Sequence, residues 1–258
     1  MTFEDMIPGA IAFGLFAFLL LMLEWGRRVG AAHRERLMAG GASGLGTIEA
    51  AIFTLLGLLV AFTFQSAASR FDARRNLIVD EANKVGTAWL RIDLLPADMQ
   101  PGMREFFRQY LDSRLSTYDK IPDMAAVAEA QALSARLQTE IWKIAISGEK
   151  KAGQSITVSL LPALNDMFDI STTRTWARKM HPPYVVFAML LFMSCAGAFT
   201  AGHGMSGCKE RSWIHSIGFS ATLAFTIFVI LDMEHPRLGT IRVDDFDQVL
   251  RDLLLSMQ

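Results

Sequence analysis

Four long runs of apolar residues divide this chain. They cover about 7–23, 45–65, 183–201 and 213–231, and Glu49 near the start of the second run is the one charged residue inside them. A helix needs about 20 apolar residues to cross the hydrocarbon layer of a bilayer. A soluble protein could bury one such helix in its core, but four of them, two in each half of the chain, predict an integral membrane protein with four transmembrane helices.

The region between the second and third runs, about 66–181, has the pattern of soluble helices. It lacks the period-two alternation of strands, and prolines and glycines divide it into candidate helices of about 66–95, 103–119, 123–147 and 156–180. No breaker separates Gln65 from Leu95, so the first candidate helix continues the second span. We therefore expect an all-α membrane protein with a juxtamembrane helical bundle inserted between the second and third transmembrane helices.

The end of the chain predicts one more short helix. Between Asp244 and Met257, apolar residues recur at helical spacing, which is typical of an amphipathic helix that packs on the bundle or lies at the membrane interface. The predicted organisation is transmembrane helices 1 and 2 in 1–65, the soluble helical insert in 66–181, transmembrane helices 3 and 4 in 182–235, and the amphipathic tail in 236–258.

Composition and motifs argue against several classes of function. The 258 residues are 52% hydrophobic with a net charge of −1, so no overall positive field indicates nucleic acid as a partner, and the lipid bilayer is the expected one. The chain has no phosphate loop, HExxH, nucleophile elbow or CxxC motif, which argues against an enzyme. Cys195 and Cys208 have no metal-ligand spacing, and no two histidines lie four residues apart, so we expect neither a metal nor a cofactor.

The short loops give a prediction of membrane orientation. The loop of about 26–44 carries four arginines and one glutamate, and the loop between the third and fourth spans carries Lys209 and Arg211. The positive-inside rule then places both loops in the cytoplasm and both termini, with the helical insert, outside. Six cations at the membrane ends of the insert argue for the opposite orientation: Arg70, Arg74, Arg75, Arg174, Arg178 and Lys179.

Charged residues gather where the second and fourth spans end. If several subunits surround an axis, Arg70 and Arg74, one helical turn apart, form an anion-attracting mouth of stacked positive rings. They could instead anchor the helix at the membrane surface or pair with acidic neighbours. Asp232 and Glu234 follow the fourth span on the same side of the membrane, so a structural clasp with an arginine is the favoured interpretation.

A further polar group lies near the end of the insert. Asn165 and Asp169 are four residues apart on one helix face, and Arg174 lies close by. With Glu81 and other residues of the first insert helix, they are expected to form an interhelical network that fixes helix register.

The second span is the best candidate to line a pore. One face carries the uncharged polar residues Thr47, Thr54, Gln65 and Ser69. The opposing side carries Phe53, Val60, Phe64 and Phe71, which could form a hydrophobic constriction. The alternative is that these side chains pack against other helices or face lipid, and the sequence leaves open which face meets an axis.

Three segments resemble those of the bacterial bestrophin-like domain proteins. They are LLGLLVAFTFQSAASRFDARRNLIVDEANKVGTAWLRIDLLP (55–96), LPALNDMFDISTTR (161–174) and LDMEHPRLGTIRV (231–243). The resemblance runs from Gly44 to Val243 and implies a multi-pass protein of the bacterial inner membrane. Bestrophins are oligomeric anion channels with four membrane helices per subunit, a pore lined by the second helix and a cytosolic helical domain. That cytosolic placement is opposite to the one our loop charges predict, and no equivalent of the acidic calcium clasp of some bestrophins is found here.

Together these observations favour a homo-oligomeric ion channel that passes small inorganic, chloride-like anions. The expected pore-lining candidates are Phe53, Thr54, Val60, Phe64 and Gln65 of the second span. The alternative is a non-conducting membrane sensor or scaffold that uses its helical stalks to relay a signal.

Overall fold

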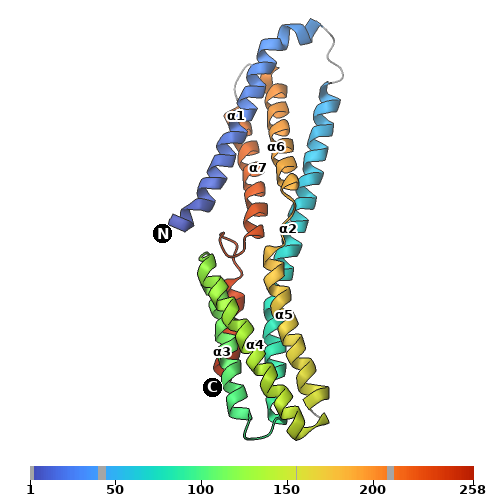
Figure 1. Cartoon of the computed structure of the whole chain (residues 1–258). Helices are drawn as coiled ribbons and strands as arrows, with labels where there is room; N and C mark the ends of the chain where they lie inside the picture. Colours follow the sequence, from blue (N-terminus) through green and yellow to red (C-terminus); the bar gives the residue numbers. More distant parts are fainter. Residues whose placement is uncertain (1–2, 40–44, 155, 208–211) are drawn as a thin grey trace. The chain divides into compact units, whose positions relative to one another are not determined.

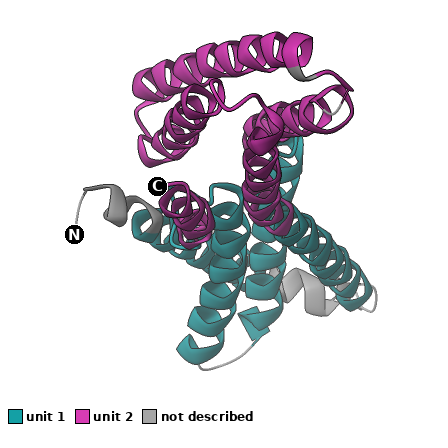
Figure 2. Cartoon of the chain, turned by 90° about the horizontal axis from the view of Figure 1, so that it is seen from below, with its two compact units in different colours: residues 1–71, 181–241 teal, residues 72–180, 242–258 magenta. Residues whose placement is uncertain are grey.

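A computed structural model of the chain describes residues 3–39, 45–154, 156–207 and 212–258. Every element in these ranges is helical, which confirms the all-α prediction (Figure 1). The chain divides into two compact units (Figure 2). Unit 1 comprises Met1–Phe71 and His181–Ile241, and unit 2 comprises Asp72–Met180 and Arg242–Gln258. Each unit has a core of its own.

Unit 1 contains the apolar helices. They are α1 (Phe3–Ala39), the first part of α2 (Leu45–Leu90), α6 (Tyr184–Gly204), a short 3-10 turn η3 (Met205–Gly207) and α7 (Trp213–Glu234). Among the described residues, four helical stretches are long and apolar enough to cross a membrane, and each overlaps one predicted span. The helix α2 is continuous from Leu45 to Leu90, as the absence of breakers predicts. Lys209 and Arg211, used in the orientation argument, lie outside the described residues.

In unit 1, α1 packs along both α6 and α7. The buried core includes Leu19 and Leu23 of α1 and Leu190 of α6. Two glycines allow close approach of the backbones, because a Cβ atom on Gly26 would collide with the carbonyl of Phe199 and one on Gly202 with the carbonyl of Leu23. Small residues at helix contacts are the usual means of packing in a membrane, where dispersion and not hydrophobic burial drives association.

Unit 2 is a bundle of helices with a docked tail. After the second part of α2 come the 3-10 turn η1 (Arg91–Leu94), α3 (Gln100–Asp119), α4 (Met124–Ala152), the π-helical turn η2 (Ile156–Leu160), α5 (Leu161–Lys179), the 3-10 turn η4 (Asp244–Asp247) and α8 (Gln248–Ser256). Local signals set the boundaries: the Asp123 carboxylate accepts hydrogen bonds from the backbone N–H groups of Ala125 and Ala126 at the start of α4. Gly153, with φ of 77°, ends α4.

The tail of the chain packs on this bundle. The helix α8 contacts α3, its Leu250 is fully buried, and Arg108 Nη1 donates to the backbone carbonyl of Met257 at 2.9 Å. Of the two alternatives that the amphipathic pattern allows, the structure has the tail on the bundle.

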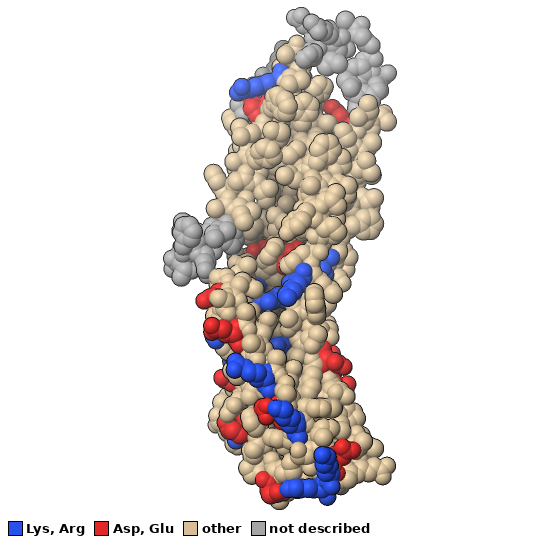
Figure 3. Space-filling model, viewed as in Figure 1, with Lys and Arg blue, Asp and Glu red and all other residues tan. Residues whose placement is uncertain are grey.

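The two units differ in surface chemistry. On the face seen in Figure 3, charged side chains are frequent over unit 2 and sparse over the apolar helices of unit 1. Exposed large apolar side chains are common in unit 1, including Phe13, Phe62 and Phe192. An exposed apolar surface of this kind fits a lipid environment or further protein contacts.

Candidate functional site

The helix α2 packs in unit 1 through one regular series of residues, which we call the packing seam. Its members are spaced alternately four and three residues apart: Glu49, Phe53, Leu56, Val60, Thr63, Ala67 and Arg70. Leu56 is buried and lies against Gly197 of α6, and the rings of Phe53 and Phe219 meet edge to face at 6.1 Å. The Thr63 hydroxyl donates to the Leu59 carbonyl at 2.8 Å, so this seam residue keeps its polar group satisfied.

The other side of the same helix is not covered by unit 1. The members of this exposed stripe are again spaced at helical intervals, and all are exposed: Thr47, Ala51, Thr54, Leu58, Ala61, Gln65 and Ser69. None is charged and most are small or polar. A membrane helix that offers such a stripe can face a second protein surface or an aqueous path, since polar groups are costly against lipid.

The structure thus separates the predicted pore-lining residues. Thr54 and Gln65 belong to the exposed stripe. Phe53 and Val60 are half-buried in the packing seam, and Val60 packs against the core of unit 1. Phe64 is 42% exposed but does not lie on the exposed stripe.

Near the end of α2 in unit 1, Arg70 meets Glu234 of α7. The Arg70 guanidinium donates through Nε at 2.8 Å and through Nη2 to the same oxygen, Oε1 of Glu234. The Arg70 side chain is 28% exposed and that of Glu234 is 1% exposed. His181 approaches the other carboxylate oxygen, with Nδ1 3.6 Å from Oε2. Burying this carboxylate depends on its cationic partner, because an isolated buried charge is costly.

Asp232, the other acidic residue predicted for the clasp, contacts backbone instead. Its carboxylate accepts hydrogen bonds from the N–H groups of Thr240, at 3.0 Å, and Ile241, at 2.7 Å, and from the Thr240 hydroxyl. These contacts fix the chain that follows α7 against the end of that helix.

Arg74, the second residue of the predicted mouth, belongs to unit 2 and is buried there. Its Nη2 donates to the carbonyl of Met180 at 2.8 Å and its Nε to the carbonyl of Ala177 at 3.2 Å. Since these carbonyls lie at the end of α5, the guanidinium binds carbonyl groups that the helix leaves without backbone partners.

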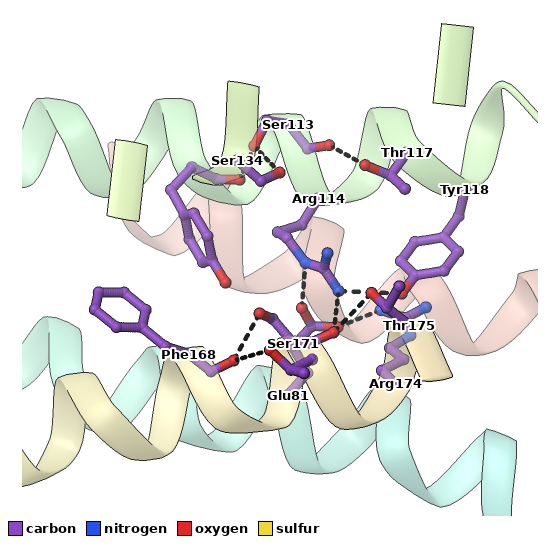
Figure 4. Close-up of polar contacts among 12 residues, drawn as sticks. Glu81, Ser113, Arg114, Thr117, Tyr118, Ser134, Phe168, Ser171, Arg174 and Thr175 are labelled. Atoms are coloured by element: carbon purple, nitrogen blue, oxygen red, sulfur yellow. Dashed lines mark hydrogen bonds and ion pairs between the residues drawn. The ribbon is translucent and has the colours of Figure 1, made fainter. Parts of the chain in front are cut away.

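The core of unit 2 holds a network of two arginines and two carboxylates. Arg114 Nε donates to Glu81 Oε1 at 2.5 Å, and Arg174 Nη1 donates to Glu81 Oε2 at 2.6 Å. Arg174 Nη2 reaches Asp247 of the tail at 2.7 Å, and its guanidinium lies 3.8 Å from the centre of the Tyr118 ring. The side chains of all four charged residues are at most 5% exposed. Figure 4 shows Arg114 reaching from α3 toward Glu81 and Ser171.

Electrostatics keep this network ionised. Burial disfavours the charge of Arg114, but the Glu81 carboxylate outweighs it and raises the arginine's pKa. Burial also raises the pKa of the Tyr110 phenol, which lies next to the network and stays neutral. The charges sum to zero, as expected for ionic groups that are removed from water.

Sequence reasoning found part of this network. It grouped Glu81 with Arg174, which the structure brings together, and with Asn165 and Asp169, which lie exposed on α5. It missed Arg114 and Asp247. Both occupy apolar-stripe positions, Arg114 in the series 103, 107, 110, 114 and Asp247 in the series 243, 247, 250, 254. A charge at such a position is the signal that could have identified them.

Among the described residues, no group of three or more His, Cys, Asp or Glu side chains is arranged to hold a metal ion. Cys195 is a free, half-buried thiol of α6, and Cys208 lies outside the described ranges.

Comparison with known proteins identifies the family. The model of the bestrophin-like domain matches residues 14–246, whereas no curated protein matches the sequence. A crystal structure of a point variant of a bacterial bestrophin homologue from Klebsiella pneumoniae is 12% identical, with a TM-score of 0.67 over 93% of this chain and 97% of that chain. Another structure of a bacterial bestrophin homologue from Klebsiella pneumoniae is 14% identical, with a TM-score of 0.62 over 93% of this chain and 97% of that chain. At these identities the likeness shows a shared fold, and the match of the domain model over most of the sequence shows that the chain belongs to the bestrophin-like domain family.

Proposed function

We propose that this protein is a homo-oligomeric ion channel of the bacterial inner membrane, in which copies of α2 surround a central pore. The exposed stripe of α2 is the observation that carries the proposal. Six of its seven residues present small or uncharged polar side chains to the side that unit 1 leaves uncovered. One chain contributes one such stripe, so enclosing an aqueous path requires several chains around an axis.

The stripe also offers a constriction. Leu58 is its one large apolar residue and is 51% exposed, and Phe62, at the edge of the stripe, is 66% exposed. A ring of such side chains narrows a pore and gates it by dewetting. Leu58 and Phe62 are therefore our candidates for the constriction. Phe53 and Val60 are not, because they are engaged in the packing seam. Thr54 and Gln65 remain candidates to line the pore.

Anion preference is the finer part of the proposal and depends on Arg70. In the pair of Arg70 and Glu234, the guanidinium is the exposed member and the carboxylate is the buried one. Because Arg70 belongs to the packing seam and not to the exposed stripe, its partly exposed guanidinium does not line the proposed pore. It acts on chloride-like anions at longer range, as one positive charge per subunit near the end of α2 in unit 1. We assign Arg74 to a structural role, since its guanidinium is buried against backbone carbonyls.

Currents across a reconstituted bilayer test the proposal. Purified protein in a planar bilayer with asymmetric chloride should give discrete currents that reverse near the chloride potential. Silence from protein that is folded and oligomeric would favour the alternative, a non-conducting sensor or scaffold. Currents that reverse near the cation potential would retain the channel and remove the anion preference.

The orientation is a separate proposal. The loop charges place the helical insert in the periplasm, whereas its place in known bestrophins is cytosolic. In a cysteine-free background, Lys143→Cys and Gly207→Cys provide probes of the two sides, since Lys143 is 64% exposed and a Cβ atom fits at Gly207. Labelling of Lys143→Cys alone by an impermeant maleimide in spheroplasts is the expected result, and labelling of Gly207→Cys alone would reverse the orientation.

A further inference from the structure

A cavity of about 160 Å³, with polar side chains in its lining, lies in unit 2 where α3, α4 and α5 meet. The side chains that matter for its chemistry are Arg114, Ser134, Gln138, Ser171, Thr175 and Trp176. We propose that this cavity binds a small carboxylate that also carries a hydrogen-bond donor, such as an amino acid zwitterion or a hydroxy acid. The proposal goes beyond the channel function and does not depend on it.

The carboxylate assignment comes from Arg114. Its side chain is 3% exposed, and it uses Nε for Glu81 and Nη2 for the Tyr118 hydroxyl and the Ser171 carbonyl. Its remaining nitrogen, Nη1, has no hydrogen-bond acceptor among the residues that the structure describes. A guanidinium has five N–H donors, and a buried one with unused donors beside a cavity suits a carboxylate ligand.

The second requirement is that the ligand carries a hydrogen-bond donor. It follows from the hydroxyl groups around the cavity. Ser171 and Thr172 both donate to the Phe168 carbonyl, and Thr175 donates to the Ser171 carbonyl. Because each hydroxyl has a single proton, these oxygens can only accept hydrogen bonds from a ligand. The Gln138 amide nitrogen donates to Ser171 Oγ at 3.0 Å and to the Tyr110 hydroxyl at 3.4 Å. Both of its N–H groups are therefore engaged, and the amide oxygen is the group left to accept from a ligand.

The charge balance and the volume of the cavity restrict the class of ligand further. No carboxylate lines the cavity, and the neighbouring network is already balanced, with Arg114 and Arg174 against Glu81 and Asp247. A net-neutral zwitterion adds no unbalanced charge to this environment, whereas a bare ammonium would face Arg114. The volume is close to that of a cavity that admits benzene, so a ligand of roughly six non-hydrogen atoms fits. Trp176, 57% exposed, borders the cavity on α5.

Binding of defined probes tests this site in the purified full-length protein. Glycine, alanine and lactate have both groups, acetate has the carboxylate alone and glycinamide has the amine without a carboxylate. Isothermal titration calorimetry at constant ionic strength should detect saturable binding of at least one of the first three, with acetate and glycinamide weaker by about tenfold. The same probes should raise the unfolding temperature in the same order.

Two tryptophan substitutions on α4 provide a matched comparison. Ala135 lines the cavity and is exposed, so Ala135→Trp should fill the space and abolish binding without loss of fold. Ala132 is exposed on the same helix but does not line the cavity, and Ala132→Trp should bind normally. Thr175→Val, which removes one acceptor and keeps the shape, should weaken binding about fivefold. The site assignment is overturned if none of the probes binds the wild type, or if Ala135→Trp binds them as well as Ala132→Trp does. Acetate binding as tightly as glycine would overturn the requirement for a donor.

Discussion

At the scale of single residues, four charged side chains of unit 2 occupy positions that a helical pattern reserves for apolar ones. Glu81 lies in the series Ile78, Glu81, Val85 and Ala88 of α2, and its carboxylate is shared by two buried arginines. Removing one partner of a buried ion pair destabilises a protein far more than replacing the whole pair by apolar residues, because the remaining partner is left charged and buried. The network therefore sets how well unit 2 tolerates substitution.

Glu81→Gln should destabilise the protein by about 3–5 kcal/mol, since the buried Arg114 then lacks a counter-charge and Arg174 keeps only Asp247. Asp80→Asn is the matched control, because Asp80 is the exposed neighbour on the same helix and its replacement should stay within about 0.5 kcal/mol. Denaturant unfolding followed by circular dichroism measures both. Equal stability of the two variants would mean that Glu81 is not held in the buried network.

Arg70 and Glu234 carry a residue-scale prediction about ion preference. Arg70→Gln alone would leave a buried carboxylate, so Arg70→Gln combined with Glu234→Gln is the variant of choice. In asymmetric potassium chloride its reversal potential should shift away from the chloride potential, because the exposed cation has gone. Arg28→Gln, which removes another exposed arginine paired with Glu24, should leave the reversal potential unchanged. A double variant that conducts with the wild-type reversal potential would exclude Arg70 from ion selection.

At the scale of elements, helix α1 and helix α6 touch backbone to backbone. The contact depends on Gly202, where a Cβ atom would strike the Leu23 carbonyl. Gly202→Val should separate the two helices and cost about 1–3 kcal/mol or more, as overpacking does. Gly14→Val on α1 is the control, because a Cβ atom there meets nothing within 4 Å. Thermal unfolding in detergent compares the two, and a stable Gly202→Val variant would contradict this packing.

Most elements were predictable because their signals are local. The continuity of α2 follows from the lack of any proline between Gln65 and Leu90, where Gly86 is the single glycine and does not end the helix, and four apolar runs give four candidate spans. The face that α2 presents to its neighbours was not predictable. Phe53 and Thr54 are adjacent and equally compatible with a membrane helix, and only the positions of α6 and α7 decide that Phe53 packs and Thr54 does not.

The partners of the charged residues could not be predicted from the sequence either. Arg70 and Arg74 are one turn apart and look alike, yet one meets the carboxylate of Glu234 and the other the carbonyls at the end of α5. Arg114 and Glu81 are 33 positions apart, and no local pattern joins them. Long-range pairing depends on how helices pack, which a periodic pattern specifies only as far as the buried face.

At the scale of the whole molecule, the match to the domain model and the shared fold identify the chain as a bestrophin-like membrane protein. The proposed function adds one claim, that the exposed stripe of α2 meets its copies around an aqueous axis. Thr54 and Thr63 allow this claim to be tested with one residue type on one helix, since Thr54 lies on the exposed stripe and Thr63, at 9% exposure, lies in the packing seam.

The most direct measurement is cysteine modification during current recording. Thr54→Cys and Thr63→Cys would be prepared with Cys195→Ala and Cys208→Ala, reconstituted in planar bilayers and exposed to a charged methanethiosulfonate reagent. If the exposed stripe lines the pore, the reagent should change the current through Thr54→Cys at once and leave the current through Thr63→Cys unaffected. A current that responds at Thr63→Cys and not at Thr54→Cys would show instead that the opposite face of α2 lines the pore.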